Sequence, residues 1–197
     1  MARKPNEVGG ELVRLDGYPE HLKYIGLIVT DFASLESTLC LTLWALLGDP
    51  ARGNAIFWSL GSSKARSDIV RGLGNELLST PASKPLLDEL KKCLEDFGTV
   101  ANKRNEIAHA QWGRPAKGGN DPFYSIARPA TKNPVFQKIW SVADLQSLAD
   151  KIITAKDRLS SINWVLHSRF GPENLKQAAK HMRKVNPETD AYFRRFD

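Results

Sequence analysis

Apolar residues recur every three or four positions along most of this chain, which is the pattern of amphipathic helices. The first run predicts a helix from about Pro19 to Leu47. Its apolar stripe consists of Ile25, Ile28, Phe32, Leu35, Leu39, Leu43 and Leu46. Asp31 and Glu36 interrupt this run, and each would cost about 2.5–3.5 kcal/mol in the middle of a bilayer. We therefore expect a buried amphipathic helix and no membrane span.

Four further helical runs follow, separated by turn residues. They are expected at about 49–60, 62–78, 83–113 and 141–171. Asp49 with Pro50, and Ser141 with Asp144, are typical of helix starts. Between the last two runs, Phe123–Arg128 and Val135–Trp140 have the composition of two strands, which predicts a small β-hairpin. Gly72 and Gly74 disfavour the third helix by about 1 kcal/mol each, and close helix packing would be a reason to keep them.

These elements predict an all-α fold, an up-and-down bundle of four or five helices with a small β-hairpin inserted before the last long helix. At 197 residues the chain is long enough for one domain with a sizeable core. We expect a mobile N-terminal arm at 1–18, the bundle at 19–171 with its insert at about 122–140, and a basic C-terminal helix and tail at 172–197.

Composition narrows the functional classes. The net charge of +6 and the pI near 9.4 favour an anionic partner, of which nucleic acid is the commonest. Cys40 and Cys93 both fall in helical runs and match neither a metal site nor a disulfide framework. We therefore expect a cytoplasmic protein without a metal or another cofactor. The N-terminus lacks the apolar run of a signal peptide.

The segment 104–109, Arg-Asn-Glu-Ile-Ala-His, carries the candidate chemistry. It ends a stripe formed by Leu86, Leu90, Leu94, Phe97, Ala101 and Ala108. Arg104 occupies the turn that this stripe skips, and an arginine facing a core is costly unless a carboxylate pairs with it. Glu36 is the first candidate for that carboxylate and Asp31 the second. The alternative for Glu36 is a solvated position on the helix edge.

Helical geometry places the remaining residues of the segment. Asn105 and His109 share the adjoining face, and Trp112 follows one turn later. Arg104 and His109 lie about 140° apart around the helix, so the two side chains flank a groove. A guanidinium and an imidazole on either side of a groove can reach the same anionic group. The alternative is an arginine paired with a buried carboxylate beside an ordinary surface histidine.

This pattern resembles the Arg-x4–6-His motif of the HEPN family. Arg104 is followed directly by Asn105, and the motif continues through Ala108 and His109 to a small residue and then an aromatic residue, as in many HEPN members. The first helix, around 32–39, is also similar to the opening helix of that family. The resemblance covers about residues 20–170. Outside the motif it rests on helix order and apolar pattern.

The resemblance implies a metal-independent endoribonuclease that uses the 2′-hydroxyl of RNA as its nucleophile. His109 would accept the 2′-OH proton or protonate the 5′-leaving oxygen. Arg104 would neutralise the phosphorane, and Asn105 would orient the imidazole or bind the phosphate. The products would be a 2′,3′-cyclic phosphate and a 5′-OH. The family also suggests a toxin or an antiviral function, with an antitoxin or regulatory protein as a further partner.

One imidazole cannot be acid and base at the same moment, and the family implies a homodimer with two motifs facing one cleft. Trp112, Trp140 and Trp164 are candidate dimer surface, with core packing as the alternative for each. Arg114, Lys117 and Trp112 are candidate RNA contacts, and a solvated loop is the alternative for the two cations. His21, His167 and His181 lie at no metal-ligand spacing.

Two other interpretations stay open from the sequence. One is a non-catalytic HEPN-like module that binds RNA or a protein partner through the same cleft. The other is a helical interaction protein in which Arg104 is structural and His109 is incidental. An intact motif does not by itself distinguish an active nuclease from either of them.

Overall fold

The computed structural model describes residues 10–12, 14–115, 123–126 and 137–168. In this part of the chain, the helices are α1 (Pro19–Leu47), α2 (Pro50–Ser59), α3 (Ser63–Leu77), α4 (Lys84–Ala108) and α5 (Val142–His167). The strands are β1 (Gly10–Leu12), β2 (Gln111–Pro115), β3 (Phe123–Ile126) and β4 (Gln137–Trp140). Two short 3-10 helices are present at Leu15–Gly17 and Pro81–Ser83. The predicted helical-bundle class is therefore confirmed.

The chain divides into two compact units. We call Met1–Asp31 with Asn102–Lys151 the sheet unit, and Phe32–Ala101 with Ile152–Asp197 the helical unit. α1, α4 and α5 each contribute residues to both. The candidate motif falls in the sheet unit. The expected C-terminal helix and tail at 172–197 lie outside the described residues.

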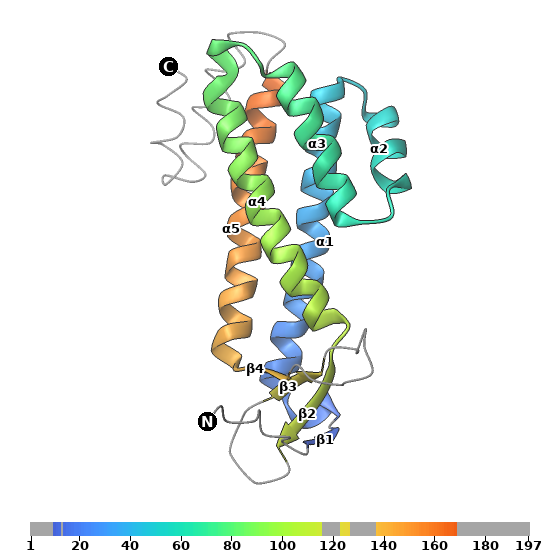
Figure 1. Ribbon diagram of the computed structural model, residues 1–197, viewed down its shortest axis with the longest axis vertical. Helices are drawn as coiled ribbons and strands as arrows, with labels where there is room; N and C mark the ends of the chain where they lie inside the picture. Colours follow the sequence, from blue (N-terminus) through green and yellow to red (C-terminus); the bar gives the residue numbers. More distant parts are fainter. Residues whose placement is uncertain (1–9, 13, 116–122, 127–136, 169–197) are drawn as a thin grey trace, which may run out of the picture. The chain divides into compact units, whose positions relative to one another are not determined.

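The helical unit is a bundle of its parts of α1, α3, α4 and α5, with α2 flanking α1 and α3 (Figure 1). Its buried side chains are those that the helical period predicts, among them Phe32, Leu35, Leu39, Leu43, Leu90, Leu94, Phe97, Ile152, Leu159 and Ile162. Phe32 and Phe97 stack with their ring centroids 5.6 Å apart, which joins α1 to α4.

Local capping signals fix the helix starts where the sequence predicts them. Asp49 accepts a hydrogen bond from the Arg52 backbone N–H, and Pro50 is the first residue of α2. Ser62 accepts from Ala65 at the start of α3. At the start of α5, the Asp144 carboxylate accepts from the Ser141 backbone N–H and hydroxyl, while the Asp144 N–H donates back to the hydroxyl. These reciprocal bonds make the predicted capping box.

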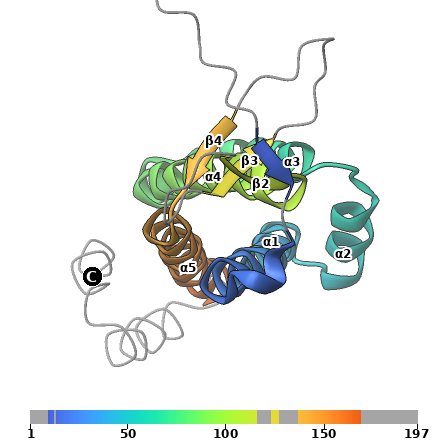
Figure 2. The ribbon, with the colours of Figure 1, turned by 90° about the horizontal axis from the view of Figure 1, so that it is seen from below.

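The strands form one antiparallel sheet in the order β1-β2-β3-β4 (Figure 2). β3 and β4 pair in the register Phe123 with Trp140, within the segments predicted as strands. They are half of a four-stranded sheet, however, and the expectation of a small two-stranded insert is corrected. A two-stranded hairpin alone is marginally stable, and pairing with β2 extends it.

The other two strands come from segments for which the sequence predicted something else. β1 lies within the expected mobile arm at 1–18, and it pairs with β2 in the register Gly10 with Pro115. β2 lies where the fourth helix was expected to continue to about 113. The helix stops at Ala108 instead, and Trp112 lies buried in the sheet unit. In both segments, pairing with distant strands determines the β conformation, and no local sequence pattern predicts that pairing.

Among the helices of the described residues, only α1 is long and apolar enough to cross a membrane by length and composition. The core helix of a soluble protein meets the same criteria, and α1 buries Phe32, Leu35 and Leu39 inside the helical unit. The absence of a membrane span stays a prediction.

Candidate functional site

The motif lies at the carboxyl end of α4, and the helix ends one residue before its histidine. His109 still donates its backbone N–H to the Asn105 carbonyl at 3.1 Å, so its backbone keeps a helix-like hydrogen bond. Ala110 donates to Ile107 at 3.3 Å, which tightens the exit from the helix. The predicted stripe is wrong in its last position, because Ile107 is buried and Ala108 is exposed.

Arg104 and Asn105 are in direct contact. The Nη1 atom of Arg104 donates to the Asn105 side-chain carbonyl at 3.0 Å. The Arg104 side chain is half-buried with its Nε atom inside, whereas Asn105 and His109 are exposed. The guanidinium is therefore held at the surface by its neighbour, next to an amide and one helical turn from an imidazole. Guanidinium and amide N–H groups are the usual ligands of phosphate oxygens.

The expected carboxylates lie as follows. Glu36 of the helical unit accepts hydrogen bonds on Oε1 from the Ser63 hydroxyl and from Nη1 of Arg66, both at 2.8 Å. Its ion pair is thus with α3. Asp31 of the sheet unit is half-buried, and none of the ion pairs among the described residues includes it. A carboxylate at Arg104 stays a prediction. From the sequence, Glu36 lies beside the apolar stripe of α1, which leaves both its burial and the partner of its carboxylate open.

The remaining predicted site residues divide in two groups. Trp112 and Trp140 are buried in the sheet unit, so the core interpretation is right for both, and Trp112 presents no open ring to RNA. Trp164 of α5 is 47% exposed. The backbone of Arg114 lies in β2 opposite Glu11. Lys117 lies outside the described residues.

Sequence reasoning missed an aromatic and cationic cluster in the helical unit. The Arg66 guanidinium lies 4.9 Å from the Trp58 ring centroid and 5.3 Å from that of Phe57. The Phe57 and Trp58 rings meet edge to face at 5.1 Å. Phe57 is buried and Trp58 is 50% exposed. The sequence feature that could have predicted this cluster is the pair of adjacent aromatic residues at the end of a short helix. Only one of two adjacent helical residues can face the core, so the other is left near the surface.

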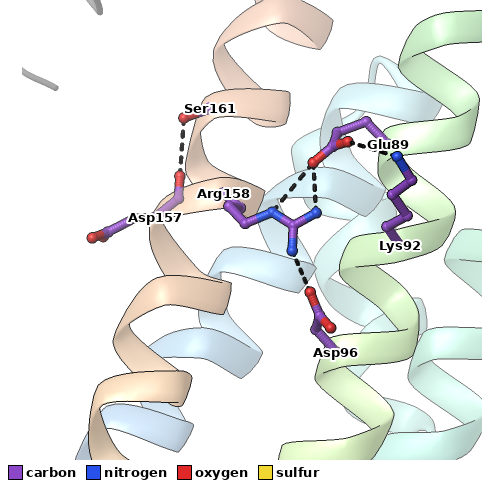
Figure 3. Close-up of polar contacts among 6 residues, drawn as sticks. All are labelled: Glu89, Lys92, Asp96, Asp157, Arg158 and Ser161. Atoms are coloured by element: carbon purple, nitrogen blue, oxygen red, sulfur yellow. Dashed lines mark hydrogen bonds and ion pairs between the residues drawn. The ribbon is translucent and has the colours of Figure 1, made fainter. Parts of the chain in front are cut away.

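A second ion-pair cluster joins α4 to α5 (Figure 3). Arg158 donates to Oε1 of Glu89 from Nη2 at 2.7 Å and from Nε at 3.2 Å, and it also donates to Asp96 from Nη1. Lys92 lies 3.9 Å from the other oxygen of Glu89. Two cations therefore face two carboxylates. Because the four charges sum to zero, the cluster has no net charge that would attract an ion. Its role is structural, since it joins α4 to α5.

The described residues contain no group of three or more His, Cys, Asp or Glu placed to hold a metal ion. Both cysteines are buried and free. Burial raises the pKa of the Cys40 thiol, and burial raises that of Cys93 to about 12. Neutral buried thiols are poor nucleophiles and poor metal ligands. The motif at the end of α4 is therefore the best-supported site of this part of the chain.

Comparison with protein-family models, with curated proteins and with solved structures gives no match to this chain.

Proposed function

We propose that this protein is a HEPN-like, metal-independent endoribonuclease. The observation that carries the proposal is the hydrogen bond between Arg104 and Asn105 at the exposed end of α4, one turn from His109. The three residues supply a cation, an amide and a titratable imidazole within the six positions 104–109. Transfer of a phosphoryl group within RNA needs these groups, a second imidazole as the acid, and the 2′-hydroxyl of the substrate.

The reaction follows from these groups. The His109 imidazole of one copy accepts the 2′-OH proton, and the 2′-oxygen forms a bond to phosphorus. Arg104 compensates the charge that develops on the phosphorane oxygens, and the Asn105 amide holds the guanidinium or the phosphate. The bond from phosphorus to the 5′-oxygen breaks, and a protonated imidazole gives its proton to that oxygen. The products are a 2′,3′-cyclic phosphate and a 5′-OH, and the protons balance.

The charge of the sequence segment that contains the motif supports a polyanionic substrate. Residues 102–151 carry eight Lys and Arg against four Asp and Glu. RNA binding releases counterions from the phosphate backbone, so an excess of cations near the site increases affinity and makes it dependent on salt. By contrast, residues 32–101 with 152–168 carry nine of each sign. The sequence segment 102–151 is therefore richer in cations than the segments 32–101 and 152–168.

A homodimer is part of the proposal, because the base and the acid must be two different imidazoles. The exposed position of His109 allows a second copy to supply the other one. Of the three tryptophans first considered for a dimer surface, Trp164 is the one with an exposed ring among the described residues. We further propose a cytoplasmic toxin or antiviral enzyme, with an antitoxin or regulatory protein as its inhibitor or activator.

The test is incubation of the purified chain with transfer RNA and single-stranded RNA in EDTA. We expect cleavage that leaves cyclic phosphate ends, lost in His109→Ala and in Arg104→Ala. His167→Ala is the matched control, because His167 is also an exposed histidine at the carboxyl end of a helix. Equal loss in all three variants, or cleavage that requires a metal, would contradict the proposal.

A second candidate is a non-catalytic module that binds RNA through Arg104 and Asn105, without a role for His109. It is favoured by the fact that Arg104 bonds to Asn105, since an arginine and an amide can grip a phosphate without any proton transfer. Binding without cleavage, weakened by Arg104→Ala and unchanged by His109→Ala, would indicate this function. A monomer that neither binds nor cleaves RNA would exclude both.

A further inference from the structure

Trp58, the penultimate residue of α2, is an exposed aromatic ring that is held from two sides. Half of its surface is open to solvent. The Arg66 guanidinium lies 4.9 Å from its ring centroid, and Phe57 packs against it edge to face at 5.1 Å. Single exposed apolar residues are normal on a protein surface, so the exposure of Trp58 alone carries no argument. The contacts of Trp58 fix its orientation and leave part of the ring open.

The groups that hold Trp58 are themselves fixed. Arg66 donates to Oε1 of Glu36 at 2.8 Å, and the Ser63 hydroxyl donates to the same oxygen. Phe57 is fully buried. α2 also packs closely on α1, because a Cβ atom at Gly53 would lie 2.5 Å from Cδ1 of Trp44. The ring is therefore ordered before any ligand arrives, and binding to it loses little conformational entropy.

Two exposed cations lie within six positions of Trp58 in the sequence. Residues 49–71 carry four Lys and Arg against two Asp and Glu, and Glu36, which pairs with Arg66, is a third carboxylate. The side chains of Arg52 and Lys64, six positions before and after Trp58, are 73% and 85% exposed. Their partners are Asp49 at 3.6 Å and Asp68 at 2.6 Å. Surface pairs of this kind contribute little to stability, so an incoming phosphate can replace either carboxylate at low cost.

We propose that Trp58 is a stacking platform for an unpaired RNA base, with Arg52 and Lys64 contacting the flanking phosphates. Proteins that bind single strands combine an exposed aromatic ring with cations in this way, and the stacking tolerates any base. The ligand is single-stranded or looped RNA, because a base inside a duplex cannot reach a ring on the protein surface. The identity of the ligand rests on the proposed function, but the contact is a different one from the Arg104 motif.

The experiment measures the affinity of the full chain for a fluorescein-labelled 2′-O-methyl oligonucleotide of about 12 nucleotides by anisotropy. This probe has no free 2′-hydroxyl, so binding is read without cleavage. We expect Trp58→Ala to weaken binding by between about 5-fold and 150-fold, the range for loss of one stacked base. Trp58→Phe should retain most of the affinity. Ile153→Ala, which removes another exposed apolar side chain from α5, should change it less than twofold.

A second variant tests the phosphate contacts independently of the ring. Arg52→Ala with Lys64→Ala should reduce the slope of log affinity against log salt by about 1.4, which is two single-strand phosphate contacts. Both side chains are largely exposed, so this variant folds even if Trp58→Ala does not.

Several outcomes would overturn the inference: unchanged affinity in Trp58→Ala, an equal loss in Ile153→Ala, or no binding by the unaltered chain. A Trp58→Ala defect confined to binding of another protein would also overturn it and would assign the surface to that partner. The proposed function fails separately, through absence of His109-dependent cleavage in EDTA. Cleavage without a contribution of Trp58 to binding would leave the proposed function intact and refute the stacking platform alone.

Discussion

Glu36 and Arg66 form an ion pair of 2.8 Å in which the two side chains are 14% and 16% exposed. The pair joins α1 to α3, and the Phe57 and Trp58 rings of α2 lie against its guanidinium. Three helices thus meet at one arginine. Removing one member of a buried pair leaves the other charge without compensation, which costs more than the pair itself contributes.

Glu36→Ala should therefore lower the free energy of unfolding by about 3–5 kcal/mol, as measured by urea denaturation. Glu36→Gln should lose less, because its amide oxygen can still accept from Ser63. Asp31→Ala is the control, since this half-buried carboxylate forms no ion pair among the described residues. Folded Glu36→Gln should cleave RNA at the unaltered rate. If Glu36→Gln has normal stability but reduced cleavage, Glu36 supports the catalytic motif instead.

The same residues show how far sequence reasoning reaches. Capping by Asp49 and by the Ser141–Asp144 box depends on groups three residues apart, and the structure confirms both. The partner of Glu36 lies 30 positions away, and a helical period reports an inward face without naming the neighbour. The helical period therefore identifies the buried side of α1 correctly, but it does not identify Arg66 as the partner of Glu36.

The end of α4 illustrates the second limit. The helical pattern predicts that Trp112 follows His109 on one helix face, but the chain changes to a strand at Gln111. β2 pairs with β1 and β3, which come from about 100 positions earlier and about 10 positions later. Nothing local encodes these partners. The predicted placement of the motif on the helix is little affected by this error. Arg104 and Asn105 lie inside α4, and the His109 backbone N–H still donates to the Asn105 carbonyl.

The Cys93 thiol predicts a loss of stability at alkaline pH. Burial raises its folded pKa to about 12, whereas an unfolded thiol titrates near 8.5. Between these values the unfolded state loses a proton that the folded state keeps, so the free energy of unfolding falls as pH rises. The slope approaches about 1.4 kcal/mol per pH unit.

Urea denaturation at a series of pH values from about 8 to 10.5 measures this slope. Cys93→Ala should show a flatter profile, because the thiol that titrates on unfolding is gone. The native chain should also react with iodoacetamide far more slowly at this position than the unfolded chain does. Equal slopes with and without Cys93 would contradict the prediction.

Two glycines of α3 provide a matched pair. A Cβ atom at Gly74 would lie 2.8 Å from Cδ2 of Leu90, whereas one at Gly72 would meet nothing within 4 Å. Gly72→Ala should therefore stabilise the chain by about 0.5–1 kcal/mol through helix propensity alone. Gly74→Ala gains the same backbone contribution but must displace the Leu90 methyl group, and overpacking costs about 1–3 kcal/mol. Gly74→Ala should thus unfold at lower urea than Gly72→Ala, and the reverse order would show that Leu90 adjusts freely.

The hydrogen bond from Arg104 to Asn105 predicts that charge alone is not sufficient at this position. Arg104→Lys keeps a cation but loses the planar fork that can bond to Asn105 and to a phosphate together. Cleavage should fall by about 100-fold to 1,000-fold, the usual effect of losing one preorganised donor at a developing charge. The free energy of unfolding in urea should fall by about 0.5–1.5 kcal/mol, the usual contribution of one hydrogen bond. Lys103→Ala, which removes the adjacent cation, should reduce cleavage only slightly and more at low salt than at high salt. If Arg104→Lys cleaves as well as the unaltered chain while Lys103→Ala does not, the guanidinium is not the group that stabilises the phosphorane.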